Sequence, residues 1–235
     1  MDEHPAEPPS RGERQQQTRA ALVDAAREVF ARDGYHGAGL GEIARIAGYT
    51  RGAVYSNFAS KADLFLAVMD ANLRDIGGRA WDPFDPATTG AGTEVAEVIR
   101  GIALATLEFI AVAARDERLS EELAGRVQVL LDLYTRIAAE ARADGEPLAA
   151  AEVGALLAAL DQGVTLLALT GLASIDQRMM RIGLRRLVDP ARAATEDARD
   201  SRDAPGGPAA LHDQVIQQRI AAALRDPALP GGERG

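Results

Sequence analysis

Apolar and polar positions between residues 40 and 57 predict two short helices joined by a tight turn. In the first helix the apolar positions recur at i, i+3, i+4 and i+7, the stripe of an amphipathic helix: Leu40, Ile43, Ala44 and Ala47. Gly48 follows that stripe, at a point where a chain leaving a helix often turns left-handed, which glycine does at little cost. The pattern therefore predicts that the chain turns at Gly48.

The second helix has two dissimilar faces. Thr50 precedes it and can accept a hydrogen bond from a free backbone N–H at its start. Val54 and Phe58 share one face, which can pack on the first helix. The residues away from that face are mostly small, polar or flat: Arg51, Gly52, Tyr55 and Asn57. This composition is typical of a helix-turn-helix whose second helix enters a DNA major groove.

Helical periodicity and capping patterns extend along the rest of the chain. Ser10-x-x-Glu13 predicts a capping box for a helix running to about Asp33, with Gly34 ending it. Further helices are predicted at 61–76, from Thr93 for some 20 residues, from a Ser120 cap to about 143, and at 149–173, 176–187 and 209–225. The sequence thus predicts an all-α protein.

The division that we expect follows these elements. It comprises a disordered tail (1–10), a three-helix DNA-binding domain with the helix-turn-helix (11–66), a C-terminal helical bundle for ligand binding and dimerisation (67–189), a linker (190–208), an extra helix (209–226) and a second tail (227–235). The extra helix could dock on its own subunit, exchange with a partner or remain a surface feature.

The segment 149–173 is apolar on all sides and carries only Glu152 and Asp161 as charges. Its longest uncharged run, Gln162 to Ile175, has 14 residues, fewer than the roughly 20 that span a bilayer. A helix apolar all round is otherwise buried in a bundle or at an oligomer interface. We therefore expect no membrane contact.

Charge is unevenly distributed along the chain. The net charge of the 235 residues is −9, yet residues 11–66 hold eight basic and six acidic side chains, so that the predicted DNA-binding end is the positive one. Lys61 is the single lysine. A cation at a helix start opposes the helix dipole, whereas a phosphate bound there would reverse the sign of that effect.

Residues from about 18 to 66 resemble the DNA-binding domain of the TetR family of bacterial transcriptional regulators. The matching positions are Thr18-Arg19, Ala25-Ala26, Phe30, Gly34-Tyr35, Ile43-Ala44, Ala47-Gly48, Val54-Tyr55, Phe58 and Ser60-Lys61-x-Asp63-Leu64. The chain departs from the family at Gly39, where Ser or Thr usually caps the second helix and touches a phosphate. At that position the phosphate contact would have to come from a backbone N–H.

The resemblance and the helix pattern together give the expected DNA contacts. Arg51 is the candidate for contacting a base edge, and guanine is the base that arginine most often contacts. Gly52 and Ala53 permit close approach, and Ala53 can meet a thymine methyl. Tyr55 and Lys61 are candidates for phosphates. The remaining candidates are Thr50, Asn57, Gly39 and Arg19, and Arg19 could equally be a solvated helix residue.

The resemblance also implies a homodimer, made through the helices near 149–173 and 176–188, and a small-molecule effector. A dimer fits the physics, because two recognition helices related by a two-fold axis read a palindromic operator at a fixed spacing. The lack of Lys, His or Arg near the helix centres predicts an uncharged, largely apolar effector. The candidate lining residues, each of which could be plain core instead, are Trp81, Phe84, Thr106, Phe109, Ile110, Gln128, Leu131, Tyr134, Gln162, Thr165 and Met179.

No catalytic or metal-binding constellation is visible in the sequence. The three histidines fall apart from one another without matching carboxylates or serines, and there is no cysteine. We expect a cytoplasmic, ligand-responsive regulator, most simply a repressor, with no cofactor and no enzymatic activity. The alternative is a helical ligand-binding protein whose helix-turn-helix no longer binds DNA; the sequence names neither the operator nor the effector.

Overall fold

The computed structural model describes residues 10–77, 93–170 and 177–189, and within these ranges every regular element is a helix. The four N-terminal helices are α1 (Arg11–Gly37), α2 (Leu40–Ile46), α3 (Arg51–Asn57) and α4 (Lys61–Gly77). They are followed by α5 (Thr93–Ala113), α6 (Glu117–Ala141), α7 (Ala150–Leu169) and α8 (Gln177–Val188). The predicted all-α class is confirmed.

The N-terminal helices share one apolar core with α5. Leu22 and Phe30 of α1, Val54 of α3 and Phe65 of α4 are almost completely buried in it. Phe109 of α5 belongs to the same core, and its ring lies 4.8 Å from that of Phe65. Because this core runs past residue 66 into α5, the boundary between the two expected domains stays a prediction.

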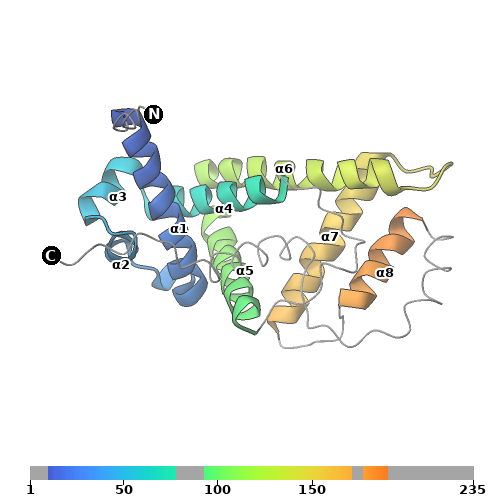
Figure 1. Ribbon diagram of the computed structural model, residues 1–235. Coiled ribbons are helices and arrows are strands. Elements are labelled where there is room, and N and C mark those ends of the chain that lie inside the picture. The colour runs from blue at the N-terminus through green and yellow to red at the C-terminus, as the bar shows by residue number, and fades with distance from the viewer. Residues whose placement is uncertain (1–9, 78–92, 171–176, 190–235) are drawn as a thin grey trace, which may run out of the picture.

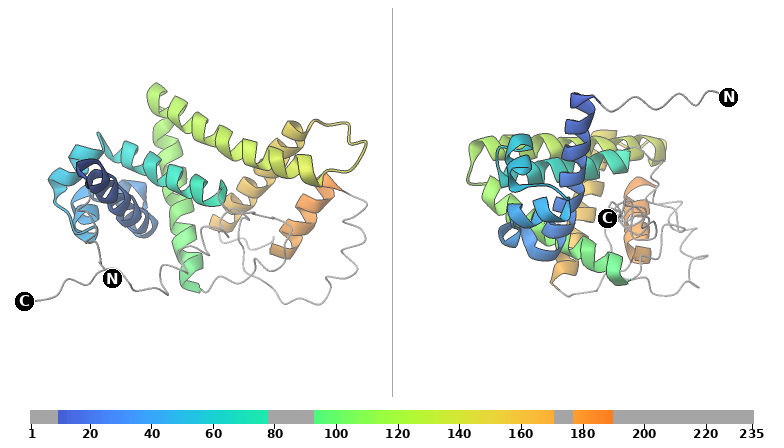
Figure 2. Two further views of the ribbon diagram at one scale, coloured as in Figure 1. Left: turned by 45° about the horizontal axis from the view of Figure 1, so that its top comes forward. Right: turned by 60° about the vertical axis from the view of Figure 1, so that its left-hand side comes forward.

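A second core lies at the other end of the molecule, among α6, α7 and α8 (Figure 1). It contains Tyr134, Leu157 and Met180, each about 1% exposed. α6 and α7 approach so closely that a Cβ at Gly154 would lie 2.6 Å from the backbone nitrogen of Thr135. The long helix α6 runs beside α4 at one end and reaches α7 at the other, so it connects the two cores (Figure 2).

The local signals that predicted the helix-turn-helix match its geometry. Ser10 and Glu13 form the expected capping box at the start of α1. Gly48 has φ 75°, the left-handed value expected for the turn, and the Thr50 hydroxyl accepts the Ala53 N–H at the start of α3. Gly34 has φ 72° and ψ 176°, a conformation open essentially to glycine alone.

Two helix boundaries differ from those predicted. α1 does not end at Gly34 but resumes as one further turn to Gly37 beyond the kink. α6 begins at Glu117 rather than at Ser120, because the carboxylate of Asp116 accepts the Leu119 N–H at 2.9 Å and caps the helix earlier. Both residue types cap helices well, and the more N-terminal one prevails here.

α7 is less buried than a core helix. By length and composition alone, Ala150–Leu167 could cross a membrane, but it is the one such helix in the described ranges, and 33% of it is buried. Its buried side includes Asp161, which accepts a hydrogen bond of 2.7 Å from the Tyr134 hydroxyl. Its other side leaves Leu156 and Leu167 nearly half exposed. The expected burial is therefore not provided by the subunit itself.

Several expectations lie outside the described residues. They concern the tails at 1–9 and 227–235, the linker at 190–208, the extra helix at 209–226, and the candidate ligand residues Trp81 and Phe84.

Candidate nucleic-acid interface and effector cavity

The outward face of α3 presents a flat polar surface. Arg51 and Tyr55 are both exposed, one turn apart, and a guanidinium nitrogen of Arg51 donates to the Tyr55 hydroxyl at 3.1 Å. The guanidinium carbon also lies 5.6 Å from the centre of the Tyr55 ring. Gly52, exposed between them, carries no side chain, so a large partner can approach the helix backbone here.

The side chains of Thr50, Asn57 and Arg19 all make hydrogen bonds within the protein. The Thr50 hydroxyl caps α3, and the Asn57 amide donates to the carbonyl of Ala53 at 2.8 Å. Arg19 of α1 donates to the Asn57 carbonyl at 2.9 Å and lies 4.2 Å above the Phe58 ring. In this structure Arg19 ties α1 to the end of α3, a contact that the solvated-residue alternative did not include.

Lys61 folds back onto the end of α1. Its ammonium donates to the carbonyls of His36 and Ala38 at 3.0 and 3.2 Å, and lies 5.1 Å from the Tyr35 ring centre. From the helix dipole alone, a cation at this helix start is unfavourable for stability. The contacts of Lys61 with carbonyls at the end of α1 act in the opposite direction, because carbonyl oxygens favour a positive charge.

Gly39 lies at the N-cap of α2, and no side chain caps this helix start. Its carbonyl accepts the N–H groups of Glu42 and Ile43 at 3.1 Å each. A Cβ at Gly39 would meet nothing within 4 Å. The N-terminal end of α2 therefore has room for a side chain or a bound group.

Two further exposed residues border this surface and were not among the predicted contacts. Tyr49 is 38% exposed in the turn directly before α3, and the Arg45 side chain is 74% exposed at the end of α2. An aromatic residue beside the turn glycine and a cation in the last turn of α2 were visible in the sequence. Neither residue lies in α3, so the pattern of that helix did not single them out.

Charged side chains fix the helix starts around this interface. Arg32 of α1 bridges Asp33 and Glu42, and so connects α1 to α2. Burial raises the pKa of Asp63, but its hydrogen bonds with Ser60 and Arg118 outweigh burial and hold that pKa below its ordinary value. Asp63 thereby joins the first turn of α4 to α6 as a carboxylate.

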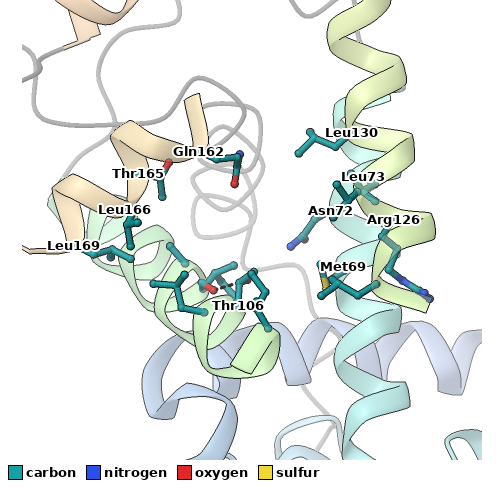
Figure 3. Close-up of a pocket in the computed structure, with 16 residues that line it drawn as sticks. Met69, Asn72, Leu73, Thr106, Arg126, Leu130, Gln162, Thr165, Leu166 and Leu169 are labelled. Atoms are coloured by element: carbon teal, nitrogen blue, oxygen red, sulfur yellow. Dashed lines mark hydrogen bonds between the residues drawn. The ribbon is translucent and has the colours of Figure 1, made fainter. Parts of the chain in front are cut away.

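A cavity of about 200 Å³ lies between the two cores, walled by α4, α5, α6 and α7 (Figure 3). Most of its lining is aliphatic, and a few polar groups lie among the aliphatic side chains. The lining residues are Met69, Asn72, Leu73, Ile102, Ala103, Thr106, Leu107, Ile110, Leu123, Arg126, Val127, Leu130, Gln162, Thr165, Leu166 and Leu169. A small, mostly apolar cavity with a few polar anchors is the usual form of a small-molecule site.

The cavity contains four of the predicted ligand residues, namely Thr106, Ile110, Gln162 and Thr165. The α4 wall was missed, since Met69 and Leu73 follow an ordinary apolar helix pattern. Asn72 presents its amide nitrogen to the cavity in Figure 3, while its oxygen accepts from the buried Arg27 side chain at 3.0 Å.

The other predicted ligand residues in the described ranges do not line this cavity. Phe109 is fully buried in the first core, and Tyr134 is bonded to Asp161 in the second. Leu131 packs against the second core, Gln128 bonds Asp132 on the surface of α6, and Met179 is 52% exposed on α8.

The expectation that no arginine lies near the helix centres was wrong. Arg126 of α6 is part of the cavity wall, but its guanidinium points away from the open space in Figure 3. It pairs with Asp70 at 2.8 Å and donates to the carbonyls of Leu66 and Glu122. The guanidinium charge is thus neutralised and hydrogen-bonded within the protein. The aliphatic part of the Arg126 side chain forms part of the wall.

Comparison with known proteins identifies a family match in the N-terminal helices. The family model described as bacterial regulatory proteins, tetR family, matches residues 22–68, which begin in the middle of α1 and end in α4. This stretch of the chain matches the TetR family.

Three TetR-family relatives illustrate the extent of the likeness. The chain is 42% identical over 62 residues to the HTH-type transcriptional regulator AcrR of Shigella flexneri, which is 26% of this chain and 29% of that protein. It is 39% identical over 77 residues to the HTH-type transcriptional activator FasR of Mycolicibacterium smegmatis, or 32% and 35% of the two chains. The HTH-type transcriptional repressor BepR of Brucella suis matches at 43% over 53 residues, or 23% and 25%. The matched segments span about a third of these relatives or less.

Two solved TetR-family structures resemble the fold of this chain over about three quarters of its length. A putative TetR-family transcriptional regulator from Rhodococcus superposes with a TM-score of 0.57 at 21% identity, covering 74% of this chain and 98% of that one. Another, from Mesorhizobium loti, gives 0.52 at 16% identity, covering 77% and 98%. This likeness supports the predicted arrangement of an N-terminal helix-turn-helix followed by a helical domain.

The relatives matched are named as transcriptional regulators, which are not enzymes. Among the residues that the structure describes, no group of three or more His, Cys, Asp or Glu side chains could hold a metal ion.

Proposed function

We propose that this protein regulates transcription by binding an inverted-repeat DNA operator as a homodimer, and that a small, largely apolar ligand in the central cavity releases it. The exposed α3 face carries the proposal, because Arg51 and Tyr55 project from a family-matched helix-turn-helix. In this proposal Arg51 contacts a base edge, probing guanine through its planar fork of donors. Gly52 and Ala53 allow the approach, with Ala53 able to meet a thymine methyl.

Phosphate contacts complete the proposed interface. Tyr55 and Lys61 supply hydrogen-bond donors beside α3, with Thr50, Asn57, Gly39 and Arg19 assisting through side chains or backbone. Lys61 can serve a phosphate without leaving α1, since an ammonium has three donors and two are used. DNA is the partner, so we place the protein in the cytoplasm.

The exposed apolar side of α7 supports a dimer. Leu156 and Leu167 lie eleven residues apart, which is three helical turns, and so share one face. An uncovered leucine face on one subunit is well matched by the same face of a second copy. A dimer would hold two α3 helices at the fixed spacing that a palindrome requires.

The cavity supports an uncharged ligand with few polar groups. Arg126, the cation of the wall, is already paired with Asp70, so an anionic ligand would have to break that pair. Thr106, Gln162 and Thr165 offer hydrogen bonds. A ligand that favours one spacing of the two DNA-binding heads would lower the operator-bound population. Relatives named as a repressor and as an activator both occur; we propose repression as the simpler mode.

The second candidate is a ligand sensor without DNA binding. The contact of Lys61 with the end of α1 favours this second candidate, because it gives Lys61 a structural role that does not require DNA. The exposed Arg51, Gly52 and Tyr55 surface favours the regulator, because folding alone gives no reason to keep these side chains on one face.

Selection of bound duplexes from a random DNA library at moderate salt separates the two candidates. We expect one inverted-repeat motif from the parent protein. Lys61→Ala should bind all sequences more weakly, with the salt slope reduced by about one. Weak binding without any motif would favour the sensor, and unchanged affinity of Lys61→Ala at every salt concentration would remove the phosphate role of Lys61.

A further inference from the structure

The end of α1 forms a short hook, residues 34–38, between the cavity and the DNA-binding helices. Gly34 breaks α1 with its positive φ, and Tyr35 then turns inward and is 7% exposed. The Tyr35 ring packs at 5.2 Å from Phe109 of α5 and at 5.4 Å from Phe65 of α4. The hook is therefore clamped between these two helices.

Two side chains of opposite charge hold the backbone of His36. The carboxylate of Glu108 on α5 accepts the His36 N–H at 2.9 Å. On the other side the ammonium of Lys61, the first residue of α4, donates to the His36 carbonyl at 3.0 Å. One residue of the hook thus connects α5 directly to the start of α4, four residues beyond the end of α3.

The contact between Glu108 and the hook is closely fitted. A Cβ at Gly34 would lie 2.8 Å from a carboxylate oxygen of Glu108. Two helical turns earlier on α5, a Cβ at Gly101 would lie 1.8 Å from the carbonyl oxygen of Ala31. Because Gly101 and Glu108 share one face of α5, this face fits α1 at two points and cannot move without moving α1.

The opposite face of α5 lines the cavity. Ala103, Thr106, Leu107 and Ile110 all belong to the wall, whereas Gly101 and Glu108 contact α1. A group that enters the cavity and pushes on α5 is thus separated from the hook only by the thickness of one helix.

We propose that Glu108 is a positioning residue that couples the cavity to the DNA-binding helices through the backbone of His36. An occupant of the cavity displaces α5, Glu108 carries the displacement to the hook, and Lys61 passes it to the start of α4. This inference rests on the proposed function and names the contact by which the cavity regulates DNA binding. The effect is a coupling between two sites, which typically changes affinity by about 5- to 150-fold.

A reversible occupant can be attached at a chosen place, because the chain has no cysteine. Ala103→Cys puts one thiol in the cavity wall. Benzyl methanethiosulfonate converts it to a benzyl disulfide with release of methanesulfinate, and a reducing agent removes the benzyl group again. The cavity of about 200 Å³ has room for this group, since a cavity of about 150 Å³ holds benzene.

Operator affinity is measured before and after this modification in three backgrounds: Glu108, Glu108→Ala and Glu108→Gln. With Glu108 present, we expect benzylation to weaken binding about tenfold or more, and reduction to restore it. With Glu108→Ala the loss should be less than about threefold. Glu108→Gln should behave like the parent, since its amide oxygen still accepts the His36 N–H. Each variant is compared with its own unmodified form, so changes in basal affinity or stability divide out.

Hydrogen exchange at residues 34–38 gives a second readout that needs no DNA. Benzylation should speed exchange of these amides with Glu108 present and leave it unchanged with Glu108→Ala. The matched control is Ala124→Cys, an exposed alanine of α6 outside the cavity wall, whose benzylation should alter neither readout.

The proposal is overturned if benzylation of Ala103→Cys weakens operator binding equally with Glu108 and with Glu108→Ala, or if it has no effect on the hook with Glu108 present. A protein that binds no operator even when unmodified counts against the proposed function instead. The exchange measurement then supports or overturns the coupling alone.

Discussion

At the scale of single residues, Gly101 is the most closely packed of the described glycines. A Cβ there would lie 1.8 Å from the Ala31 carbonyl oxygen, within the backbone of α1, which cannot move aside cheaply. We expect Gly101→Ala to lower the free energy of unfolding by about 2 kcal/mol or more, as overpacking does. Chemical denaturation measures this loss.

Gly125 of α6 provides the matched control. A Cβ at Gly125 would meet nothing within 4 Å, and the residue lies inside a helix. Gly125→Ala should therefore raise the free energy of unfolding by about 0.5–1 kcal/mol, because alanine loses less backbone entropy. Equal effects of the two substitutions would contradict the close packing of α5 on α1.

Gly39 offers a residue-scale test of the DNA interface. Its φ of −102° suits any residue, and space is free around it. Gly39→Ser should supply the missing cap of α2, stabilise the fold by a few tenths of a kcal/mol, and tighten operator binding several-fold through a new phosphate contact. Thermal unfolding and operator titration measure the two effects. Tighter folding with unchanged operator affinity would place this helix start away from the phosphates.

At the scale of elements, Asp63 connects α4 with α6. The Ser60 hydroxyl donates to its carboxylate at 2.7 Å, and Arg118 of α6 pairs with it at 3.1 Å. Since these contacts lower the pKa of Asp63 in the folded protein, the stability that they add is complete above the ordinary pKa of 3.8. It is lost as the pH falls through the folded value.

Asp63→Asn isolates this contribution, because asparagine does not titrate. We expect the parent to be the more stable of the two at pH 6 and the difference in unfolding free energy to shrink below pH 3.8. Urea denaturation across this range checks it. A difference independent of pH would mean that the carboxylate charge does not hold α4 to α6.

The exposed leucines make α7 the element to test for dimerisation. Leu156→Glu with Leu167→Glu puts two charges on the apolar face without touching the buried side of the helix. We expect the parent to sediment as a dimer at micromolar concentration, and the double variant to sediment as a monomer and to bind the operator more weakly. Ala124→Glu, a charge on exposed α6, should leave the assembly unchanged. A double variant that still sediments as a dimer would move the interface elsewhere.

Elements were predictable where short-range chemistry decides them. Ser10, Gly48 and Thr50 act on groups within a few residues of themselves, so the spacing in the sequence revealed their roles. The start of α6 was misplaced because Asp116 and Ser120 are both good caps, and the pattern does not rank them. The exposed face of α3 followed from periodicity alone, since Val54 fixes the inward side.

Contacts between distant segments could not be predicted in this way. Lys61 reaches a carbonyl 25 residues earlier, and Arg126 pairs with an aspartate 56 residues before it. Neither pairing leaves a trace in spacing or composition. The cavity shows the same limit, because Asn72 and Met69 look like an ordinary helix face until α4 is packed opposite α7.

At the scale of the whole molecule, DNA binding and ligand binding are assigned to different places relative to the two cores in the function that we propose. The N-terminal core holds α3 outward, and the cavity between the cores lies against α4 and α5, which both contact the end of α1. This arrangement lets a small ligand act on DNA binding without touching the DNA surface. The net charge of −9 makes the placed cations, Arg51 above all, decisive for affinity.

The most direct test of this account is a titration of the selected operator and of a scrambled duplex with the parent protein and with Arg51→Ala, at one fixed salt concentration. We expect the parent to prefer the operator by about a thousandfold or more. Arg51→Ala should lose about 1–3 kcal/mol of that preference, while its affinity for the scrambled duplex changes little. Equal affinity of the parent for the two duplexes would contradict sequence-specific DNA binding and the proposed role as a transcriptional regulator.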